Sequence, residues 1–318
     1  MKIAVWGLGN HAINKILPTL KENEHLELYG VYSRNNDVVD MCKKKFDCQS
    51  WESSDAMLDD VNLNVVYVTT PTGIHSSQGI KILESKKHFW CEKPFTSSHK
   101  ETKELIKLSI DQNLSVAEGF MYLYHPQFLW LKNYLQQYSN KEIINIDVKF
   151  TMPYPENPGW RYNPEMGGST LLDIGTYNLS IIFGLIENEV PKILFKEVRN
   201  IPSIPIDMNG HISLVYPSGT ICNLFWGMGL PYRNEIDVTT TNGSIYSDKI
   251  FSKPEDYKPS FIIRDFNGNK QTIESETCNH FIGMFNYFCR LVGNKDEAQK
   301  ERDRILSLSE WVEKIRDY

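Results

Sequence analysis

A short apolar segment at the start of the chain runs directly into a glycine-rich turn. Residues 2–6 read Lys-Ile-Ala-Val-Trp, and the pattern G-x-G-x-x-A follows in Gly7, Leu8, Gly9, Asn10, His11 and Ala12. In such a turn the first glycine permits a tight reversal, and the second lets the backbone approach a pyrophosphate. The following helix adds N–H donors and the positive end of its dipole. We therefore expect a strand–turn–helix unit that binds a dinucleotide, with a purely structural turn as the alternative. We interpret the side chain of His11 as solvent-facing.

Residues 1–120 alternate short apolar runs with amphipathic stretches, which is typical of parallel strands joined by crossover helices. The expected strands are 3–7, 28–33, 65–69, 88–92 and 115–119, and the expected helices are 12–21, 38–45, 76–85 and 100–113. Residues 65–68 are continuously apolar, as expected for a strand buried on both faces. The sequence therefore predicts an α/β domain over residues 1–120, a doubly wound parallel sheet of the Rossmann type.

The pattern changes after residue 120. We expect a helix at 126–137, a strand at 143–151 and a glycine-flanked helix at 168–184. Further strands are expected at 192–199, 208–216, 220–226, 235–241 and 243–247, and helices at 278–292 and 298–317. Turn sequences such as Asn242-Gly243 favour antiparallel pairing. We expect a second domain, residues 121–318, with an α+β fold on a large open, mostly antiparallel sheet.

Composition limits the classes of partner. The net charge is −6 and no basic stretch offsets it, which argues against nucleic acid. The six cysteines are scattered without a C-x-x-C pair, which argues against a structural metal site and fits a reducing cytoplasm. The first strand begins at Lys2, leaving no room for a signal peptide, and polar residues interrupt the longest charge-free run. We expect a cytoplasmic protein that binds neither metal nor membrane.

The end of the second expected strand bears on the choice of cofactor. NAD-binding domains carry an acidic residue there, which grips the ribose 2′-hydroxyl. This chain has Ser33 and Arg34 instead. A guanidinium pairs bidentately with phosphate, so these residues suit a 2′-phosphate, unless Arg34 is simply an exposed loop residue. We therefore expect NADP, with NAD as the alternative.

Two later strands end at the same carboxyl edge, where doubly wound sheets bind ligands. Thr70 and Pro71 follow one of them and are expected to lie along the dinucleotide. His75 follows closely, and two interpretations are equally open: it lines the binding site, or it makes a local hydrogen bond at a helix start.

Glu92, Lys93 and Pro94 end the next strand. Proline restricts Lys93 to extended geometry, and an X-Pro bond can also adopt the cis form, which would aim the lysine side chain. A partly desolvated lysine beside Glu92 is able to donate a proton or to hydrogen-bond a substrate oxygen. The alternative is a solvated lysine at a strand end.

Asp173 and Tyr177 lie four residues apart in the glycine-flanked helix, and hence on one helix face. A carboxylate and a phenol placed in this way form a plausible proton relay. A buried Asp–Tyr pair is, however, more often structural.

Together these residues resemble the glucose-fructose oxidoreductase / inositol dehydrogenase (Gfo/Idh/MocA) family of NAD(P)-dependent oxidoreductases. The resemblance runs over nearly the whole chain and rests on four motifs: G-x-G-x-x-A, Thr70-Pro71, Glu92-Lys93-Pro94 and Gly167-Gly168-x-x-Leu171-Leu172-Asp173-Ile174-Gly175. It implies a substrate pocket between a Rossmann domain and an open-sheet domain, with Lys93 catalytic.

Many members carry a histidine where this chain has Tyr177. The tyrosine resembles the branch that contains glucose-fructose oxidoreductase, xylose and dihydrodiol dehydrogenases and nucleotide-sugar 3-ketoreductases, in which the tyrosine is taken as the acid/base. The Ala117–Gln127 segment, with His125, and Trp160-Arg161 resemble the same branch. His125 and Arg161 are expected near the pocket, Arg161 on the cofactor side, although each has an equally good structural interpretation.

The resemblance and the residues lead to one expected function. Hydride passes between NADP(H) and a sugar or cyclic polyol, Tyr177 moves the proton with help from Lys93, and Asp173 orients the hydroxyl groups or the lysine. The alternatives are a ketoreductase acting on a nucleotide-linked keto-sugar and, less favoured, a non-catalytic dinucleotide sensor. Because an open sheet covered on one face leaves the other bare, we expect a homodimer or homotetramer.

Overall fold

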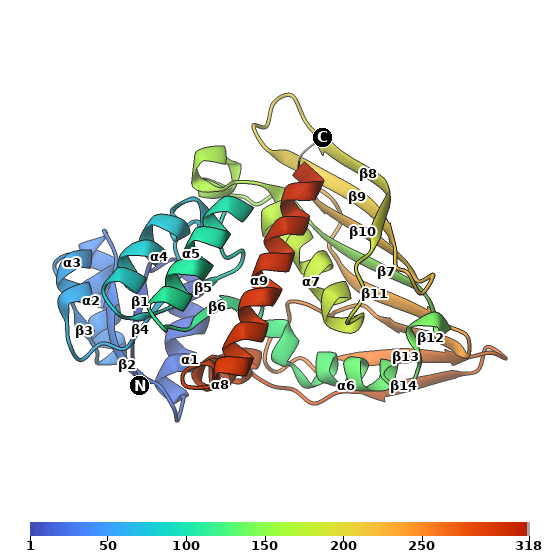
Figure 1. Ribbon diagram of the computed structural model, residues 1–318, viewed down its shortest axis with the longest axis horizontal. Helices are drawn as coiled ribbons and strands as arrows, with labels where there is room; N and C mark the ends of the chain where they lie inside the picture. The colour runs from blue at the N-terminus through green and yellow to red at the C-terminus, as the bar shows by residue number, and fades with distance from the viewer. Residues whose placement is uncertain (317–318) are drawn as a thin grey trace. The chain divides into compact units, whose positions relative to one another are not determined.

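In the computed structural model, which describes residues 1–316, the chain forms two compact units (Figure 1). Unit 1 comprises Met1–Phe120 together with the C-terminal segment that begins at Phe281, and unit 2 comprises Met121–His280. The expected division at residue 120 assigned the C-terminal segment to the second domain, and here the structure differs. The expected end of the last helix at Asp317 lies outside the described residues.

Unit 1 is built on a six-stranded parallel sheet with the strand order β3-β2-β1-β4-β5-β6. The strands are β1 (Lys2–Trp6), β2 (Glu27–Tyr32), β3 (Gln49–Ser50), β4 (Val65–Val68), β5 (His88–Glu92) and β6 (Val116–Gly119). This is the doubly wound Rossmann order, which reverses direction between β1 and β4. The expected fold of the N-terminal part is confirmed. The two-residue β3 was not expected, since it is too short to leave a periodic pattern.

The first five helices of unit 1 follow its strands in alternation, and the last two come from the end of the chain (Figure 1). They are α1 (Leu17–Glu22), which continues the π-helical turn η1 (Ala12–Ile16), then α2 (Asn36–Phe46), α3 (Ser54–Asp59), α4 (His75–Glu84), α5 (His99–Asp111), α8 (His280–Leu291) and α9 (Lys295–Arg316). Asn35, Ser53 and Ser98 cap α2, α3 and α5, because the side chain of each accepts a hydrogen bond from a backbone N–H of the first turn.

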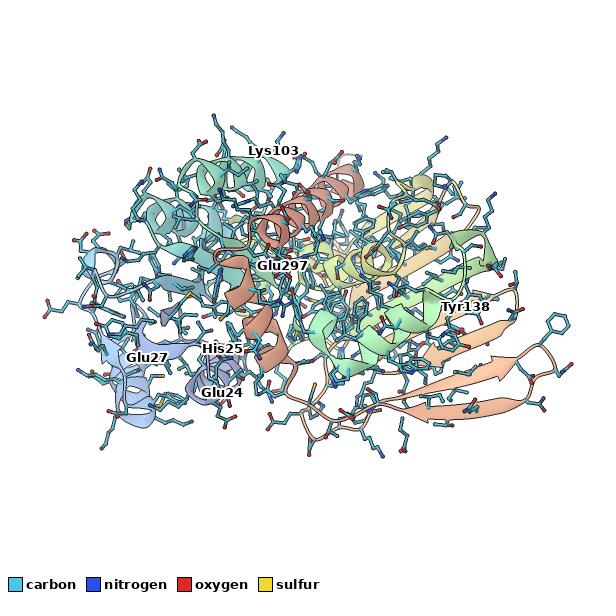
Figure 2. The ribbon with its side chains drawn as sticks, turned by 60° about the horizontal axis from the view of Figure 1, so that its bottom comes forward. Glu24, His25, Glu27, Lys103, Tyr138 and Glu297 are labelled. Carbon is cyan, nitrogen blue, oxygen red and sulfur yellow. The ribbon has the colours of Figure 1, made fainter. Side chains whose placement is uncertain are left out.

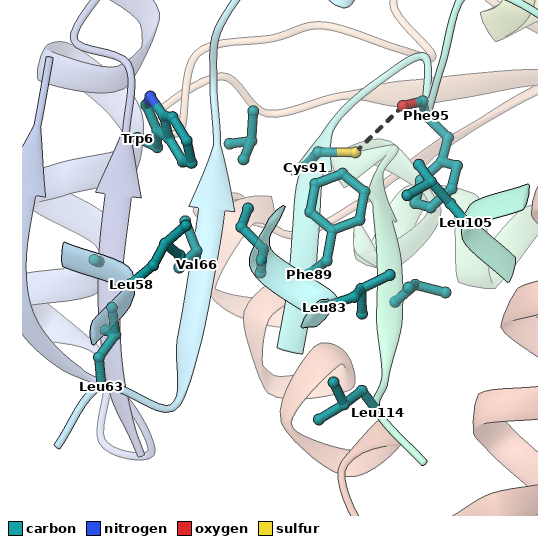
Figure 3. Packing of buried hydrophobic residues seen from close by; sticks show 14 of the residues in the cluster. Trp6, Leu58, Leu63, Val66, Leu83, Phe89, Cys91, Phe95, Leu105 and Leu114 are labelled. Atoms are coloured by element: carbon teal, nitrogen blue, oxygen red, sulfur yellow. Dashed lines mark hydrogen bonds between the residues drawn. The ribbon is translucent and has the colours of Figure 1, made fainter. Parts of the chain in front are cut away.

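One face of the parallel sheet packs on α3, α4, α5 and α9. Phe89 and Cys91 of β5 lie in this core with Leu83 of α4 and Leu105 of α5, and all four are fully buried (Figure 3). Burial of each large apolar side chain stabilises the fold by roughly 1.5–3 kcal/mol. The outer side of α5 carries exposed charged residues such as Lys103 (Figure 2). This core holds β5 rigidly, and Lys93 follows its last residue.

The opposite face of the same sheet explains why the C-terminal segment belongs to unit 1. Phe285 of α8 packs edge-on against Tyr67 of β4 at a ring-centroid distance of 5.0 Å, and Phe288 packs against Trp90 of β5 at 5.4 Å. Without α8 these aromatic strand residues would face water. A parallel sheet needs cover on both faces, and here α8, from the end of the chain, covers the part of the second face that carries Tyr67 and Trp90.

Unit 2 is built on an eight-stranded sheet with the order β14-β13-β12-β11-β7-β10-β9-β8. The strands are β7 (Ile143–Met152), β8 (Lys192–Asn200), β9 (Asp207–Val215), β10 (Ile221–Met228), β11 (Arg233–Thr240), β12 (Gly243–Ser247), β13 (Ser260–Asp265) and β14 (Lys270–Glu274). Every pair is antiparallel except β7 with β10. The expected open, mostly antiparallel sheet is confirmed. The hairpin β13–β14 was not expected, because four of the five residues of β14 are polar and exposed.

The helices of unit 2 cover one face of this sheet. They are α6 (Pro126–Leu135) and α7 (Thr176–Leu185), with the short helical turns η3 (Met121–Tyr124), η4 (Asn140–Glu142), η5 (Gly159–Tyr162), η6 (Pro164–Met166) and η7 (Leu171–Gly175). Trp130 of α6 stacks on Phe261 of β13 at 4.9 Å and on Tyr134 at 5.0 Å, and Tyr138 ends this aromatic row just beyond α6 (Figure 2). Strand β9 alternates buried and half-buried residues, as a strand does when one face of its sheet is covered.

Within residues 1–316, no helix has both the length and the apolar character needed to cross a membrane.

Candidate active-site residues at the sheet edge and in the aromatic cage

The glycine turn after β1 has a geometry that only glycine accepts at its first position. Gly7 has a φ of +108°, and a Cβ placed on it would lie 2.9 Å from both Thr69 Oγ1 and Thr70 Cγ2. Its N–H donates to the carbonyl of Tyr32 at 2.9 Å, and its own carbonyl accepts from the Thr69 hydroxyl at 2.7 Å. The turn is thereby tied to the ends of β2 and β4.

The second glycine of the turn faces open space. A Cβ placed on Gly9 would meet no atom within 4 Å, whereas Ala12 is fully buried. No side chain caps the helical turn that begins at Ala12. The first N–H groups of a helix need an acceptor. An open backbone next to uncapped N–H groups fits a pyrophosphate at this turn.

His11 connects the glycine turn to the end of β5. Its Nε2 lies 3.1 Å from Glu92 Oε1, and the hydroxyl of Tyr67 donates to the same oxygen at 2.7 Å. Burial pulls the pKa of His11 down, but the charge of Glu92 and its hydrogen bond outweigh burial and raise that pKa. Burial likewise pushes the pKa of Glu92 up, and His11, Tyr67 and Lys93 together lower it. The side chain of His11 is 46% exposed, in line with the solvent-facing interpretation, yet it is also paired.

The β4 and β5 ends are joined by a buried histidine. His75 is 1% exposed, with Nδ1 3.1 Å from the carbonyl oxygen of Pro94 and Nε2 2.8 Å from that of Thr70. The Thr70 hydroxyl donates to Gln78 Oε1 at 2.6 Å. Both nitrogen atoms of His75 therefore contact protein groups, as in the second of its two interpretations. Pro71 precedes the short helical turn η2 (Thr72–Ile74).

Lys93 directly follows β5 and is half-buried, and the Lys93–Pro94 peptide bond is cis. At the end of β2, Ser33 Oγ accepts from the N–H of Asn35 at 3.4 Å. Arg34 is exposed. The carboxyl edge of one parallel sheet thus carries the glycine turn, Ser33 and Arg34, Thr70 and Pro71, and Glu92 and Lys93.

A buried charged cluster behind this edge escaped the sequence analysis. Glu118 accepts from the N–H of Phe95 at 2.8 Å and lies 3.2 Å from Arg304 Nη1. Arg304 also contacts Glu301 at 2.6 Å, and Glu301 accepts from the N–H of Glu118 at 3.1 Å. Burial raises the pKa of Glu118 to about 7, although Arg304 opposes the rise. In sequence, Glu301 and Arg304 look like an ordinary surface pair at i,i+3, so no local signal could have revealed their burial.

In unit 2, an aromatic cage fixes the ring of Tyr177. Tyr177 is 7% exposed, and its ring centroid lies 5.3 Å from those of Phe150 and Phe251 and 5.8 Å from that of Tyr122. Its hydroxyl donates to Met121 Sδ at 3.6 Å. Aromatic neighbours at these distances hold the ring in one orientation.

Asp173 lies in η7, a π-helical turn that leads into α7. Such turns occur frequently at functional sites. Asp173 Oδ2 pairs with Arg161 Nε at 3.0 Å, and the guanidinium of Arg161 lies 5.1 Å from the centre of the Trp160 ring. Arg161 is thus engaged with the proposed orienting carboxylate.

His125, the other residue with two interpretations, caps α6. Its Nδ1 accepts from the N–H of Gln127 at 3.0 Å, and the residue is fully buried. Burial, with a smaller contribution from the charge of Lys253, lowers the pKa of His125 to about 3. The histidine is therefore neutral at physiological pH.

Two family models match the chain, one for each unit. Residues 1–120 match the oxidoreductase family with an NAD-binding Rossmann fold, and residues 128–246 match the GFO/IDH/MocA C-terminal domain.

Several proteins are similar over nearly the whole length. A dTDP-3,4-didehydro-2,6-dideoxy-alpha-D-glucose 3-reductase of Streptomyces violaceoruber is 25% identical over 99% of this chain and 94% of its own. A D-xylose 1-dehydrogenase (NADP(+)) of Haloferax volcanii is 22% identical over 99% of this chain and 96% of its own. The crystal structure of a 3-ketoreductase from Actinomadura kijaniata, in complex with NADP and TDP-benzene, has a TM-score of 0.93 at 23% identity and covers 99% of this chain and 97% of that chain.

The structural likeness confirms the expected fold, and the two family models confirm the expected family and its class of enzyme. The chain belongs to the GFO/IDH/MocA family of oxidoreductases, with an NAD-binding Rossmann fold in its first unit.

Proposed function

We propose that this protein is an NADP(H)-dependent oxidoreductase that reduces the keto group of a nucleotide-linked sugar. The observation that carries the proposal is the joint presence, at one sheet edge, of an open glycine turn after β1 and a lysine that directly follows β5, two strands away in the sheet. The proposal also rests on the curated relatives, of which several are dTDP-keto-sugar 3-reductases matched over most of their length.

The cofactor would lie along the carboxyl edge of unit 1. The uncapped N–H groups after Gly9 suit its pyrophosphate. Ser33 and Arg34 would hold the ribose 2′-phosphate, for which an exposed guanidinium that pairs with no described residue is well suited. Thr70, Pro71 and Glu92 would line the path toward the nicotinamide. NADPH, when bound, supplies the hydride.

The proton would come from the chain. Tyr177, held in its aromatic cage, would donate its phenolic proton to the substrate oxygen. Lys93 would make this transfer easier, because a nearby cation stabilises the phenolate that remains. Asp173, paired with Arg161, would orient the sugar hydroxyls. The Actinomadura protein has been studied through variants of a lysine and a tyrosine, and their separation in sequence equals that between Lys93 and Tyr177.

A second candidate is the dehydrogenation of a free aldose or cyclic polyol, which the sequence analysis ranked first. The Haloferax D-xylose dehydrogenase favours it, since it matches this chain over as great a length as the reductases do. The chemistry at Lys93 and Tyr177 is the same in reverse, so the two candidates differ in substrate and direction.

The test is a spectrophotometric assay of the nicotinamide. NADPH and NADH are offered with dTDP-linked 3-keto-sugars, and NADP⁺ and NAD⁺ with free aldoses, cyclic diols and inositols. We expect oxidation of NADPH by the nucleotide-linked ketone. Turnover of free sugars alone would select the second candidate. Binding of NADPH with no turnover of any carbonyl would contradict both candidates and favour a dinucleotide sensor.

We further propose a cytoplasmic homodimer or homotetramer that assembles through the uncovered face of the unit 2 sheet. Phe195, His211 and Phe225 line a hollow on this sheet, and Phe195 of the edge strand β8 is 50% exposed. A second copy would bury this apolar surface. Sedimentation should give a dimer or tetramer at micromolar concentration, and Phe195→Glu should shift it to the monomer. A wild-type monomer would refute the proposal.

A further inference from the structure

The three residues that follow β5 are held from two sides by buried side chains to which the proposed mechanism gives no role. On one side His75, from the start of α4, contacts the carbonyl oxygens of Pro94 and Thr70 at 3.1 and 2.8 Å. On the other side Glu118, at the end of β6, accepts from the N–H of Phe95 at 2.8 Å. The peptide group between Pro94 and Phe95 is thus held at its carbonyl by a residue of α4 and at its N–H by a residue of β6.

His75 is placed to act as a spacer between two strand ends. It is 1% exposed, and burial lowers its pKa although its contacts with backbone groups oppose the shift. The neutral ring carries one N–H, which it donates to one of the two carbonyl oxygens. The ring therefore sets the distance between the loop after β4 and the loop after β5.

Glu118 is itself held by the C-terminal helix. It is 2% exposed and pairs with Arg304, which also binds Glu301, and both of these residues belong to α9. Glu301 in turn accepts from the N–H of Glu118. Both oxygens of the carboxylate are thus engaged, Oε1 by the N–H of Phe95 and Oε2 by Arg304.

The side chain of Phe95 supplies a third anchor. Its ring lies 5.3 Å from that of Phe89 in the core of unit 1, and its carbonyl accepts a weak hydrogen bond from Cys91 Sγ at 3.8 Å (Figure 3). The segment that follows β5 is therefore fixed at Pro94 and Phe95. Lys93 lies between these two fixed residues and the end of the strand.

We propose that His75 and Glu118 are positioning residues that clamp the Pro94–Phe95 segment and thereby fix the direction in which Lys93 leaves the end of β5. A lysine side chain has four rotatable bonds, so its ammonium group can be placed accurately only if its backbone is fixed. The expected effect of the clamp on turnover rests on the proposed role of Lys93. The effect of the clamp on the position of Lys93 can be measured without turnover.

The first experiment measures the position of Lys93 through its reactivity. Wild-type protein and the variants His75→Phe and Glu118→Met, which keep the side-chain volume but remove the hydrogen bonds, are treated with an amine-reactive succinimidyl ester. The rate of acylation at Lys93 is followed by peptide mass spectrometry. The matched control is His88→Phe, a histidine at the opposite end of β5 that contacts Ser115.

We expect a severalfold change in the acylation rate of Lys93 in both clamp variants and none in His88→Phe. Glu118→Gln keeps an acceptor for Phe95 but loses the ion pair with Arg304, so its rate should lie between those of the wild type and Glu118→Met. Circular dichroism establishes which variants fold. A folded His75→Phe tests the contact with Pro94, and a folded Glu118→Met tests the contact with Phe95. Wild-type reactivity of Lys93 in a folded clamp variant would overturn the proposal for that residue.

The second experiment is a double-mutant cycle with Lys93→Ala, read as kcat and as the Kd of NADPH. We expect each clamp variant to lose about 10- to 100-fold in kcat, the scale of a misplacement of about 1 Å, with the Kd unchanged. In the Lys93→Ala background the same substitutions should cause no further loss. Additive losses would show that the clamp does not act through Lys93. If Lys93→Ala alone retained full turnover, the proposed role of Lys93 would fail, while the acylation rates would still decide the clamp.

Discussion

Replacing Gly9 by alanine separates cofactor binding from folding, because the added methyl group meets no protein atom. A Cβ on Gly9 would have no atom within 4 Å, and its φ lies outside the left-handed region, so alanine fits without strain. Such a substitution stabilises a fold by about 0.4–1 kcal/mol through the unfolded chain. The methyl group would, however, occupy the space that the backbone leaves for a pyrophosphate. We expect a folded protein that no longer binds NADPH.

Gly7→Ala is the matched comparison, with the opposite outcome for stability. At a φ of +108°, with Thr69 and Thr70 atoms 2.9 Å from the new Cβ, alanine is strained and crowded. Left-handed geometry costs about 1–2 kcal/mol and overpacking about 1–3 kcal/mol, so unit 1 should lose roughly 2–5 kcal/mol of unfolding free energy.

Urea unfolding with and without NADPH measures both effects. Ligand at 100 times its Kd should raise the unfolding free energy of the wild type by about 2.7 kcal/mol. This increment should vanish in Gly9→Ala, whose unfolding free energy without NADPH should equal that of the wild type or exceed it by the small amount given above. If Gly9→Ala bound NADPH with wild-type affinity, the assignment of the pyrophosphate to this turn would be wrong.

Three further predictions concern single side chains. Lys93→Ala and Tyr177→Phe should each lower kcat by about 10²–10⁴-fold and leave the Kd of NADPH unchanged, since proton transfer contributes on that scale; full turnover in both variants would remove them from the mechanism. Arg34→Ala should weaken binding of NADPH by about 10- to 100-fold and leave that of NADH unchanged, because a charge-assisted hydrogen bond contributes about 1.5–3 kcal/mol; an equal loss for both cofactors in fluorescence titration would place Arg34 elsewhere. Burial lowers the pKa of His88 to about 4 from 6.5, so the folded state resists protonation that the unfolded chain accepts. The stability from His88 is present above pH 6.5 and is lost as the pH falls toward 4, by up to about 3 kcal/mol; unfolding free energies of the wild type and His88→Phe should therefore converge in acid, and parallel curves would contradict this.

The parts of the fold that sequence reasoning reached are those with a local signal. The strand before Gly7 and the continuously apolar residues 65–68 have the pattern of buried parallel strands, and the structure has strands there. The hairpin β13–β14 lacks such a pattern, since β14 is almost entirely exposed and β13 does not alternate between buried and exposed residues. It is a strand pair because β12 offers β13 an edge, which is a property of the sheet.

The candidate site divides in the same way. Gly7, Gly9 and Lys93 can be found from the sequence, because each stands in a short motif directly after an expected strand. The sequence allows two interpretations of His75, because its contacts depend on where the loop after β5 lies. Contacts between residues at the ends of different strands cannot be predicted from the spacing of those residues in the sequence.

What the sequence by itself determined is most of the succession of elements, the Rossmann character of the first 120 residues, and the strand ends at which the ligand-binding chemistry of such sheets would be placed. Only the tertiary structure decided that the last helices return to the first unit, where α8 covers Tyr67 and Trp90 and α9 brings Arg304 to Glu118. The reason is that local propensity sets which residues form a helix, whereas the face that remains uncovered on a distant sheet sets where that helix must pack.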